Sequence, residues 1–273
     1  MSYATLMVAV DPDRSREQIV RIAGQLADKF ASQLLGVAAI PIRPPVLANG
    51  VVMDVAGPDE IDLLKARLYD SEVWFRDKAG TSSRAIAWRC ELDFPTDFVI
   101  AQARCADLVV VSRNERFQDA YNSVDAGAII LKAGRPALVV PIGVKSFAAD
   151  RVVIGWKDTR EARRAIIDAL PFMHEASQVT VAGICEDGSE KATQRGIDDV
   201  VQYLAHHRIK SGSKVVSHAQ ESSAARLLRL ARDEGADLLV TGAYGHSRLG
   251  EWVFGGVTQE LLAASPICCL MSH

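Results

Sequence analysis

The sequence predicts an α/β protein made of two tandem, doubly wound domains, each with a five-stranded parallel sheet. Two observations support this fold class. Short apolar runs alternate with helical patterns along the chain, and the second half repeats landmarks of the first half in the same order. Such alternation is typical of a parallel sheet covered by helices on both faces. The 273 residues are long for one compact domain and comfortable for two.

The internal repeat defines the expected domains. Matching segments follow one another in both halves: Ser15-Arg16-Glu17 with Thr159-Arg160-Glu161, Ala31–Gln33 with Ala176–Gln178, Ala106–Val110 with Ala236–Val240, and Pro136–Val140 with Pro266–Leu270. We therefore expect one domain over residues 1–143 and another over residues 150–273. The link from Gly143 to Ala149 is too short to let two domains drift far apart.

Apolar runs bounded by turn residues give the expected strands. In the first half they are Leu6–Val10, Leu34–Ile40, Ala85–Cys90, Leu108–Val111 and Ala137–Val140. In the second half they are Val152–Trp156, Val179–Ile184, Lys214–His218, Leu238–Thr241 and Ile267–Leu270. Apolar residues at helical spacing between Ile19 and Phe30, and between Ala165 and Met173, predict the first helix of each half. The stretch Pro41 to Pro58 occurs in the first half alone, and we expect a surface loop there, with a lid as one interpretation.

Composition and charge exclude several classes of protein. A formal net charge of −3 argues against a chain built to bind nucleic acid. No apolar run reaches the roughly 20 residues that a membrane-spanning helix needs. The N-terminus lacks a basic segment and a cleavage site, so we expect a cytoplasmic protein. The five cysteines form no C-x-x-C motif, and we interpret them as packing residues.

The stretch from Ala236 to Leu270 carries the strongest functional signal. The expected strand Leu238–Thr241 is followed by glycines at 242 and 245, and a glycine pair at 255 and 256 precedes a helical pattern. Glycines leave backbone N–H groups accessible to a ligand. A helix N-terminus carries partial positive charge, so the expected ligand is an anion, and a phosphate in particular. The alternative is that these glycines serve turns and helix caps.

The spacing Gly242-x2-Gly245-x9-Gly255-Gly256 resembles the nucleotide-binding signature of the universal stress protein family, Gly-x2-Gly-x9-Gly-Ser/Thr. Gly256 departs from that pattern, because the family has Ser or Thr there, but Thr258 offers a hydroxyl two residues later. The resemblance covers nearly the whole chain as two copies. It implies the Rossmann-like fold of the adenine nucleotide α-hydrolases, and binding of an adenine nucleotide, ATP with or without Mg²⁺, in the second half.

Thirteen residues are expected to form this site: Gly155, Trp156, Lys157, Ile184, Thr241, Gly242, Tyr244, Gly245, His246, Gly255, Gly256, Val257 and Thr258. Trp156 suits either stacking on a base or packing in the core. Lys157 suits either contact with the phosphates or a place on the solvated surface. Tyr244 and His246 could contact ribose or phosphate.

The first half is expected not to bind a triphosphate. It has Asp11 where the family has an Asp near the base and sugar, whereas the second half has Lys157 at that position. Aligning the halves places Ser112, Glu115 and Asp125 opposite Gly242, Gly245 and Gly255. A carboxylate at position 125 would cap its own helix and repel phosphate. The first half is thus expected to be a structural partner.

Three functions follow from these residues. The leading one is a stress-response or signalling module that binds ATP without obligate turnover, because no catalytic set of residues is visible. The second is a weak ATPase, for which only His246 and Glu251 could position water. The third is an interaction scaffold with two degenerate sites. The family resemblance also implies pairing through the last strands, Pro136–Val140 and Pro266–Leu270, as a pseudo-dimer within one chain or a homodimer between chains.

Overall fold

The computed structural model describes residues 2–13, 16–42, 46–48, 51–53, 56–80, 84–113, 119, 121–185, 189–217, 221–245 and 256–273, with backbone alone for 46–48, 51–53 and 217. Glu115, His246, Glu251 and Gly255 of the expected sites lie outside these residues.

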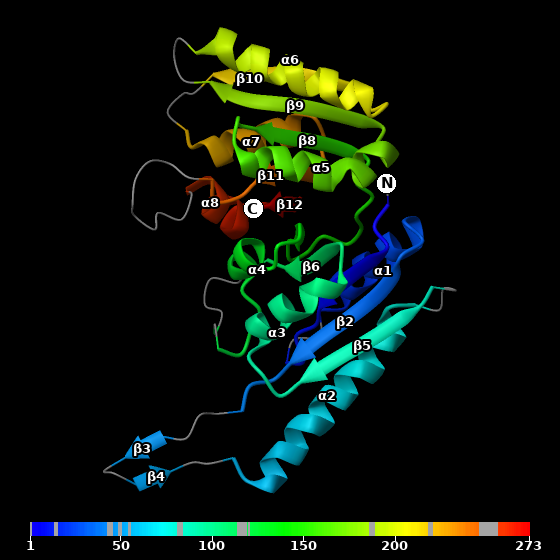
Figure 1. The fold of residues 1–273 in the computed structure, drawn as a ribbon, viewed down its shortest axis with the longest axis vertical. Helices are drawn as coiled ribbons and strands as arrows, with labels where there is room; N and C mark the ends of the chain where they lie inside the picture. The colour runs from blue at the N-terminus through cyan, green and yellow to red at the C-terminus, as the bar shows by residue number, and fades with distance from the viewer. Residues whose placement is uncertain are drawn as a thin grey trace.

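The core of the molecule is one ten-stranded sheet in the order β10-β9-β8-β11-β12-β7-β6-β1-β2-β5 (Figure 1). The first half supplies β1 (Thr5–Ala9), β2 (Gln33–Ala39), β5 (Ile86–Glu91), β6 (Leu108–Ser112) and β7 (Ala137–Val140). The second half supplies β8 (Arg151–Trp156), β9 (Gln178–Cys185), β10 (Ser211–Ser217), β11 (Leu238–Gly242) and β12 (Cys268–Ser272). Within each set the strands are parallel, so the predicted α/β fold class is confirmed.

The two five-stranded sets are joined at their last strands. β7 pairs with β12 in antiparallel register, with Val139 opposite Cys269 and Leu138 opposite Leu270. The sequence pattern predicts two sheets, and this pairing merges them into one. Each last strand thereby gains a partner for the backbone groups that a sheet edge would leave exposed.

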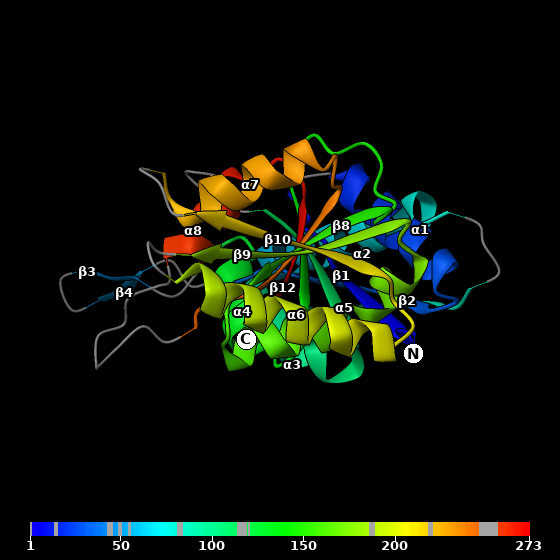
Figure 2. The same ribbon diagram turned by 90° about the horizontal axis from the view of Figure 1, so that it is seen from above.

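Helices cover both faces of the sheet, because strand residues alternate between two cores (Figure 2). Leu6 and Val8 face one core, whereas Met7 and Ala9 face the other. The first core is covered by α1 (Glu17–Lys29), α2 (Pro58–Lys78), α5 (Arg160–Glu175) and α6 (Glu190–His206). The second is covered by α3 (Pro95–Gln102), a 3-10 turn at Ala103–Cys105, α4 (Ala126–Lys132), α7 (Ser223–Asp233) and α8 (Gly256–Ala264). None of the described helices combines the length and apolarity needed to cross a membrane.

An aromatic cluster joins the halves on the α1 and α5 side. The Phe172 ring of α5 lies 5.2 Å from Phe30, 5.6 Å from Tyr3 and 5.9 Å from Phe147, measured between ring centroids. The Tyr3 hydroxyl donates a hydrogen bond to the backbone carbonyl of Asp168. Burial, reinforced by the charges of Asp168 and Asp107, raises the pKa of Tyr3 well above its ordinary value. The phenol therefore stays neutral in this apolar contact.

The stretch between Pro41 and Pro58 differs from the expected loop. It contains two short antiparallel strands, β3 (Val46–Ala48) and β4 (Val51–Met53), which form a separate two-stranded sheet. This hairpin projects away from the main sheet (Figure 1). Val46, Val52 and their apolar neighbours favour strands, and this propensity outweighs the proline and glycine signals that bound the segment.

Candidate functional site

Strand order reverses at one point in each half, and this defines two candidate sites. In the first half the chain runs outward from β1 to β2 and β5, then returns to β6 on the other side of β1. In the second half the same reversal lies between β8 and β11. Ligands of open parallel α/β sheets bind beyond the carboxyl ends of the strands at such points. We call them the first and second switch points.

The second switch point gathers most of the predicted site residues. Gly155 and Trp156 end β8, Thr241 and Gly242 end β11, and Ile184 lies near the end of β9. Lys157, directly after β8, is exposed, whereas Thr241 is buried. The strands thus bring together residues that are more than 80 positions apart in sequence, from 155 to 242.

Two helices begin on either side of the loop that runs from Gly242 to Gly245. The backbone N–H of Tyr244 donates a hydrogen bond of 3.1 Å to Thr258 Oγ1 in the first turn of α8. On the other side, Thr159 caps α5 by accepting a hydrogen bond from the Ala162 N–H at 3.3 Å. A Cβ atom at Gly245 would lie 3.7 Å from Thr159 Cγ2. The loop therefore lies between the N-termini of α5 and α8.

Gly242 is required by the packing of α5. A Cβ atom there would lie 2.4 Å from the backbone nitrogen of Ala162 and 2.6 Å from the carbonyl carbon of Glu161. These are backbone atoms, so no side-chain rotation could relieve the overlap. The sequence pattern predicts that this glycine allows a ligand to approach, but the group that approaches it most closely is the start of helix α5.

Gly245 lies over a buried carboxylate. A Cβ atom at this position would be 3.2 Å from Oε2 of Glu161, whose side chain is only 2% exposed. Burial raises the pKa of Glu161, but hydrogen bonds from the Arg160 guanidinium, its own backbone and Thr159 outweigh that effect and lower it. Glu161 is therefore ionised and paired with Arg160, whose side chain is 64% exposed.

The remaining predicted residues divide between packing and the surface. The Trp156 indole belongs to the core side, because a Cβ atom at Gly196 of α6 would lie 3.3 Å from its Nε1. At Gly256 a Cβ atom would meet nothing within 4 Å, and the neighbouring Val257 is exposed. The start of α8 is thus open to solvent. The Trp156 side chain, in contrast, packs against the core and α6 in this structure.

Tyr244 reaches from the second half to the first. Its backbone has a φ of +56°, which is uncommon for a residue other than glycine. A Cβ atom at Gly127 of α4 would lie 2.6 Å from the Tyr244 hydroxyl, so the phenol lies against α4. Burial, with the charge of Asp125, raises the pKa of Tyr244 to about 12.

This pKa gives a prediction about alkaline stability. Because the folded-state pKa lies above the ordinary value of 10.0, the neutral phenol contributes stability that is full below pH 10 and is lost as the pH rises toward about 12. We expect the free energy of unfolding of Tyr244→Phe to lack this part of the pH dependence. In an ultraviolet titration, the variant should show one phenol fewer that ionises near pH 12. Tyr69→Phe, at a side chain 66% exposed, is the matched control. Identical alkaline titrations for Tyr244→Phe and wild type would contradict this.

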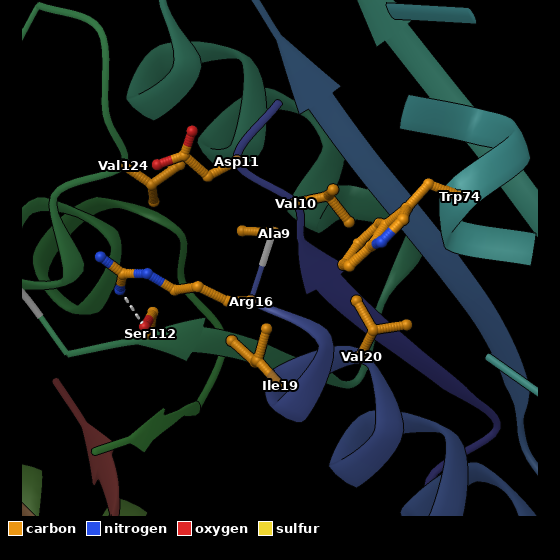
Figure 3. A pocket seen from close by; sticks show the side chains of 9 residues that line it. All are labelled: Ala9, Val10, Asp11, Arg16, Ile19, Val20, Trp74, Ser112 and Val124. Carbon is orange, nitrogen blue, oxygen red and sulfur yellow. Dashed lines mark hydrogen bonds between the residues drawn. The ribbon is translucent and has the colours of Figure 1, made fainter. Parts of the chain in front are cut away.

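The first switch point contains a cavity (Figure 3). The cavity has a volume of about 20 Å³. This volume has room for about one water-sized group. The lining residues come from the ends of β1 and β6, the starts of α1 and α4, and α2: Ala9, Val10, Asp11, Arg16, Ile19, Val20, Trp74, Ser112 and Val124.

Arg16 spans this cavity. It is the N-cap residue of α1, and its guanidinium donates hydrogen bonds to Ser112 Oγ and to the Arg113 carbonyl oxygen, the latter at 3.4 Å. Sequence reasoning missed Arg16 and Trp74. The available signal was the repeated triplet Ser15-Arg16-Glu17 and Thr159-Arg160-Glu161, which places one arginine at the start of a helix beside each switch point.

The start of α4 agrees with the expectation for Asp125. Its carboxylate accepts a hydrogen bond of 2.9 Å from the Gly127 N–H, so it caps the helix as predicted. A helix start that already holds a carboxylate has little attraction for phosphate.

Comparison with known proteins gives a family match for part of the second half. Residues 174–273 match the model of the universal stress protein family. No curated protein matches the sequence significantly. The family resemblance predicted from the glycine spacing is thus confirmed.

Solved structures extend the universal stress protein fold to the first half. The chain is similar to a universal stress protein from Archaeoglobus fulgidus DSM 4304, with a TM-score of 0.75, 12% identity and 98% of both chains covered. It is also similar to a putative universal stress protein from Pseudomonas aeruginosa UCBPP-PA14, with a TM-score of 0.62, 15% identity, and 98% of this chain and 92% of that chain covered. At these identities the likeness shows a common fold for nearly the whole chain.

Proposed function

We propose that this universal stress protein binds an adenine nucleotide, ATP with or without Mg²⁺, at the second switch point, and that binding acts as a signal in a stress response. The observation that carries the proposal is the position of the Gly242–Gly245 loop between the N-termini of α5 and α8. Residues 1–143 and 150–273 would act as two domains paired as an internal pseudo-dimer through β7 and β12.

The phosphates would interact with the start of α8. The first amides of a helix have no partner within the helix, and the helix dipole adds partial positive charge there. Gly256 and Val257 begin α8 and are exposed, so their side of the helix is accessible to a phosphate. The exposed cations of Lys157 and Arg160 would add attraction for a polyanion.

The base and ribose would lie toward β8 and β9. Gly155, Ile184 and Thr241 flank the carboxyl ends of these strands, at the position where parallel sheets bind ligands. His246 and Gly255, outside the described residues, would complete the phosphate loop. The start of α5 occupies the space beside Gly242, so we assign Gly242 the role of positioning the loop. We assign the backbone amide of Gly245 the role of binding the ligand.

Substitution of Gly245 by glutamate tests this site. Gly245 does not have a positive φ, so a side chain fits its backbone, but a second carboxylate would lie beside Glu161 and repel phosphate. We expect ATP affinity, measured by calorimetric titration, to fall at least tenfold. Gly212→Glu in β10 is the matched control, because a Cβ atom there meets nothing within 4 Å and the change in charge is the same. Equal ATP affinity in Gly245→Glu and Gly212→Glu would remove the assignment.

A nucleotide-independent scaffold is the second candidate, and one observation favours it. The ionised Glu161 carboxylate lies beside Gly245, where a nucleotide would bring negatively charged oxygens. Native mass spectrometry of the freshly purified protein, followed by ATP titration, separates the two functions. A scaffold would carry no nucleotide and would bind none at millimolar ATP.

A further inference from the structure

Helix α8 is short and buries little of its own surface. Its nine residues include three that are buried, Thr258, Leu261 and Leu262. Isolated helices of this length are marginal in water, so most of their stability comes from contacts with the rest of the protein. The position of α8 therefore depends on the groups that hold its two ends.

Arg113 of the first half holds the last turn of α8. Ser265 directly follows the helix, and its N–H donates a hydrogen bond of 2.9 Å to the Leu261 carbonyl. The Arg113 guanidinium donates a hydrogen bond of 2.9 Å to the carbonyl oxygen of Ser265, which is only 2% exposed. The last carbonyls of a helix have no partner within it, and a cation near them also interacts favourably with the helix dipole. Arg113 thus caps a helix of the other half.

Arg113 is itself fixed to the sheet of the first half. It directly follows β6, and its N–H donates a hydrogen bond of 2.9 Å to the Val140 carbonyl at the end of β7. Burial raises the pKa of Cys269 in β12 to about 11, against the opposing effects of a hydrogen bond with Ser265 and the charge of Arg113. The guanidinium therefore lies close to the junction at which β7 and β12 pair.

The start of α8 is connected to α4 through Tyr244. The Tyr244 N–H donates its hydrogen bond to Thr258 in the first turn of α8. The Tyr244 hydroxyl lies against Gly127 of α4, where an added Cβ atom would also be 3.8 Å from a methyl group of Leu262. Gly127 therefore gives α4 a bare surface for Tyr244 and α8. The two helices lie side by side across the junction (Figure 1).

The matching position of the second half shows that this arginine is not a general requirement of the junction. Ala243 follows β11 as Arg113 follows β6, and its N–H also donates a hydrogen bond to the last strand, at the Ser272 carbonyl and 2.9 Å. Ala243 has a buried methyl group in place of a guanidinium, so it cannot cap α4 in return. The asymmetry favours a role for Arg113 at α8 in particular.

We propose that the phosphate site at the start of α8 is built across the two halves, with Arg113 and Gly127 of the first half as positioning residues. The identity of the ligand rests on the proposed function. The second half supplies the amides, and the first half fixes the orientation in which they meet the ligand. Because an anion site made of amides depends on their direction, a helix that tilts or frays loses affinity even while the protein stays folded.

Native-state hydrogen exchange tests the positioning role without a ligand. The control for Arg113→Ala is Arg104→Ala, which removes an exposed arginine whose guanidinium bonds to the Ala101 carbonyl within the first half. We expect the amides of α8 to exchange at least tenfold faster in Arg113→Ala, and those of β11 and β12 to be unchanged, because the helix loosens while the sheet stays intact. Arg113→Lys should restore most of the protection, since lysine also supplies a cation and a donor.

A second pair of variants tests the other end of α8. Gly127→Ala places a methyl group 2.6 Å from the Tyr244 hydroxyl, so we expect faster exchange in α8. Adding Tyr244→Phe removes the overlapping oxygen atom and should restore the protection. Exchange in α8 that is unchanged by Gly127→Ala, or that Tyr244→Phe does not restore, would overturn the role of Gly127.

Calorimetric titration with ATP connects the helix to the site. We expect Arg113→Ala to bind ATP at least tenfold more weakly than Arg104→Ala, although both remove one positive charge, and Arg113→Lys to bind it nearly as well as the wild type. Unchanged exchange in α8, faster exchange that extends to β11 and β12, or equal ATP affinity in the two alanine variants would overturn the inference. A wild type that binds no ATP would overturn the proposed function, whereas faster exchange confined to α8 would still support Arg113 as the residue that positions this helix.

Discussion

Gly242→Ala is expected to destabilise the protein by about 3 kcal/mol, which is a large fraction of the total stability of many domains. The added Cβ atom would lie 2.4 Å from the Ala162 nitrogen and 2.6 Å from the Glu161 carbonyl carbon. Relief requires the whole start of α5 to move away from β11. That shift would also disturb Ala162, Ala165 and Ile166, which form part of the buried face of α5. Overpacking of a core typically costs about 1–3 kcal/mol, and we expect the upper end of this range because backbone atoms must move.

Chemical denaturation measures this effect against two matched variants. Gly256→Ala adds the same methyl group where nothing lies within 4 Å, so we expect a change within about 0.5 kcal/mol. Ser112→Gly removes the Cβ atom at the matching position of the first half and should cost far less than Gly242→Ala. A Gly242→Ala variant as stable as the Gly256→Ala variant would show that α5 does not approach β11 as closely as described.

Phe172→Ala is expected to destabilise the protein by about 3–5 kcal/mol and to loosen the connection between the halves. Phe172 is fully buried, and its ring contacts Tyr3 and Phe30 of the first half as well as Phe147 of the link. Loss of this ring leaves a cavity at the junction itself. The β7–β12 ladder still connects the halves in this variant, since it pairs Val139 with Cys269 and Leu138 with Leu270.

The unfolding curve of Phe172→Ala tests both the loss of stability and the connection between the two halves. We expect the wild type to unfold in one transition and Phe172→Ala to unfold earlier, with two resolvable transitions. Phe94→Ala is the control, because this ring is 44% exposed and packs at 4.9 Å against Tyr121 alone among the described ring contacts. Two transitions already present in the wild type, or a Phe172→Ala variant matching Phe94→Ala, would contradict a shared core.

Much of the candidate site could be predicted from the sequence, because parallel α/β sheets place strand ends at one edge. Gly155, Thr241 and Gly242 were expected together and lie together at the ends of β8 and β11. The capping role of Asp125 also followed from its position before an apolar helix, and its hydrogen bond to Gly127 bears it out. In both cases local pattern and strand order were sufficient.

Other features of the site could be recognised only in the tertiary structure. Sequence spacing could not distinguish a glycine that a ligand approaches from one that a helix approaches, because both need the same missing side chain. It could not show that Arg16 reaches β6 while Arg160 stays with Glu161, since each depends on distances between separate elements. It also could not join β7 to β12 within the chain, because an exposed last strand can pair with its own chain or with another.

The sequence by itself determined the doubled α/β fold, the family resemblance and the glycine-rich loop, because hydrophobic period and residue spacing are properties of one strand or helix at a time. Only the tertiary structure decided how the space around that loop is used. The presence of a Cβ atom at Ser112 and its absence at Gly242 change how near a helix can come, and this closeness determines whether a cavity or a packed contact lies at each switch point.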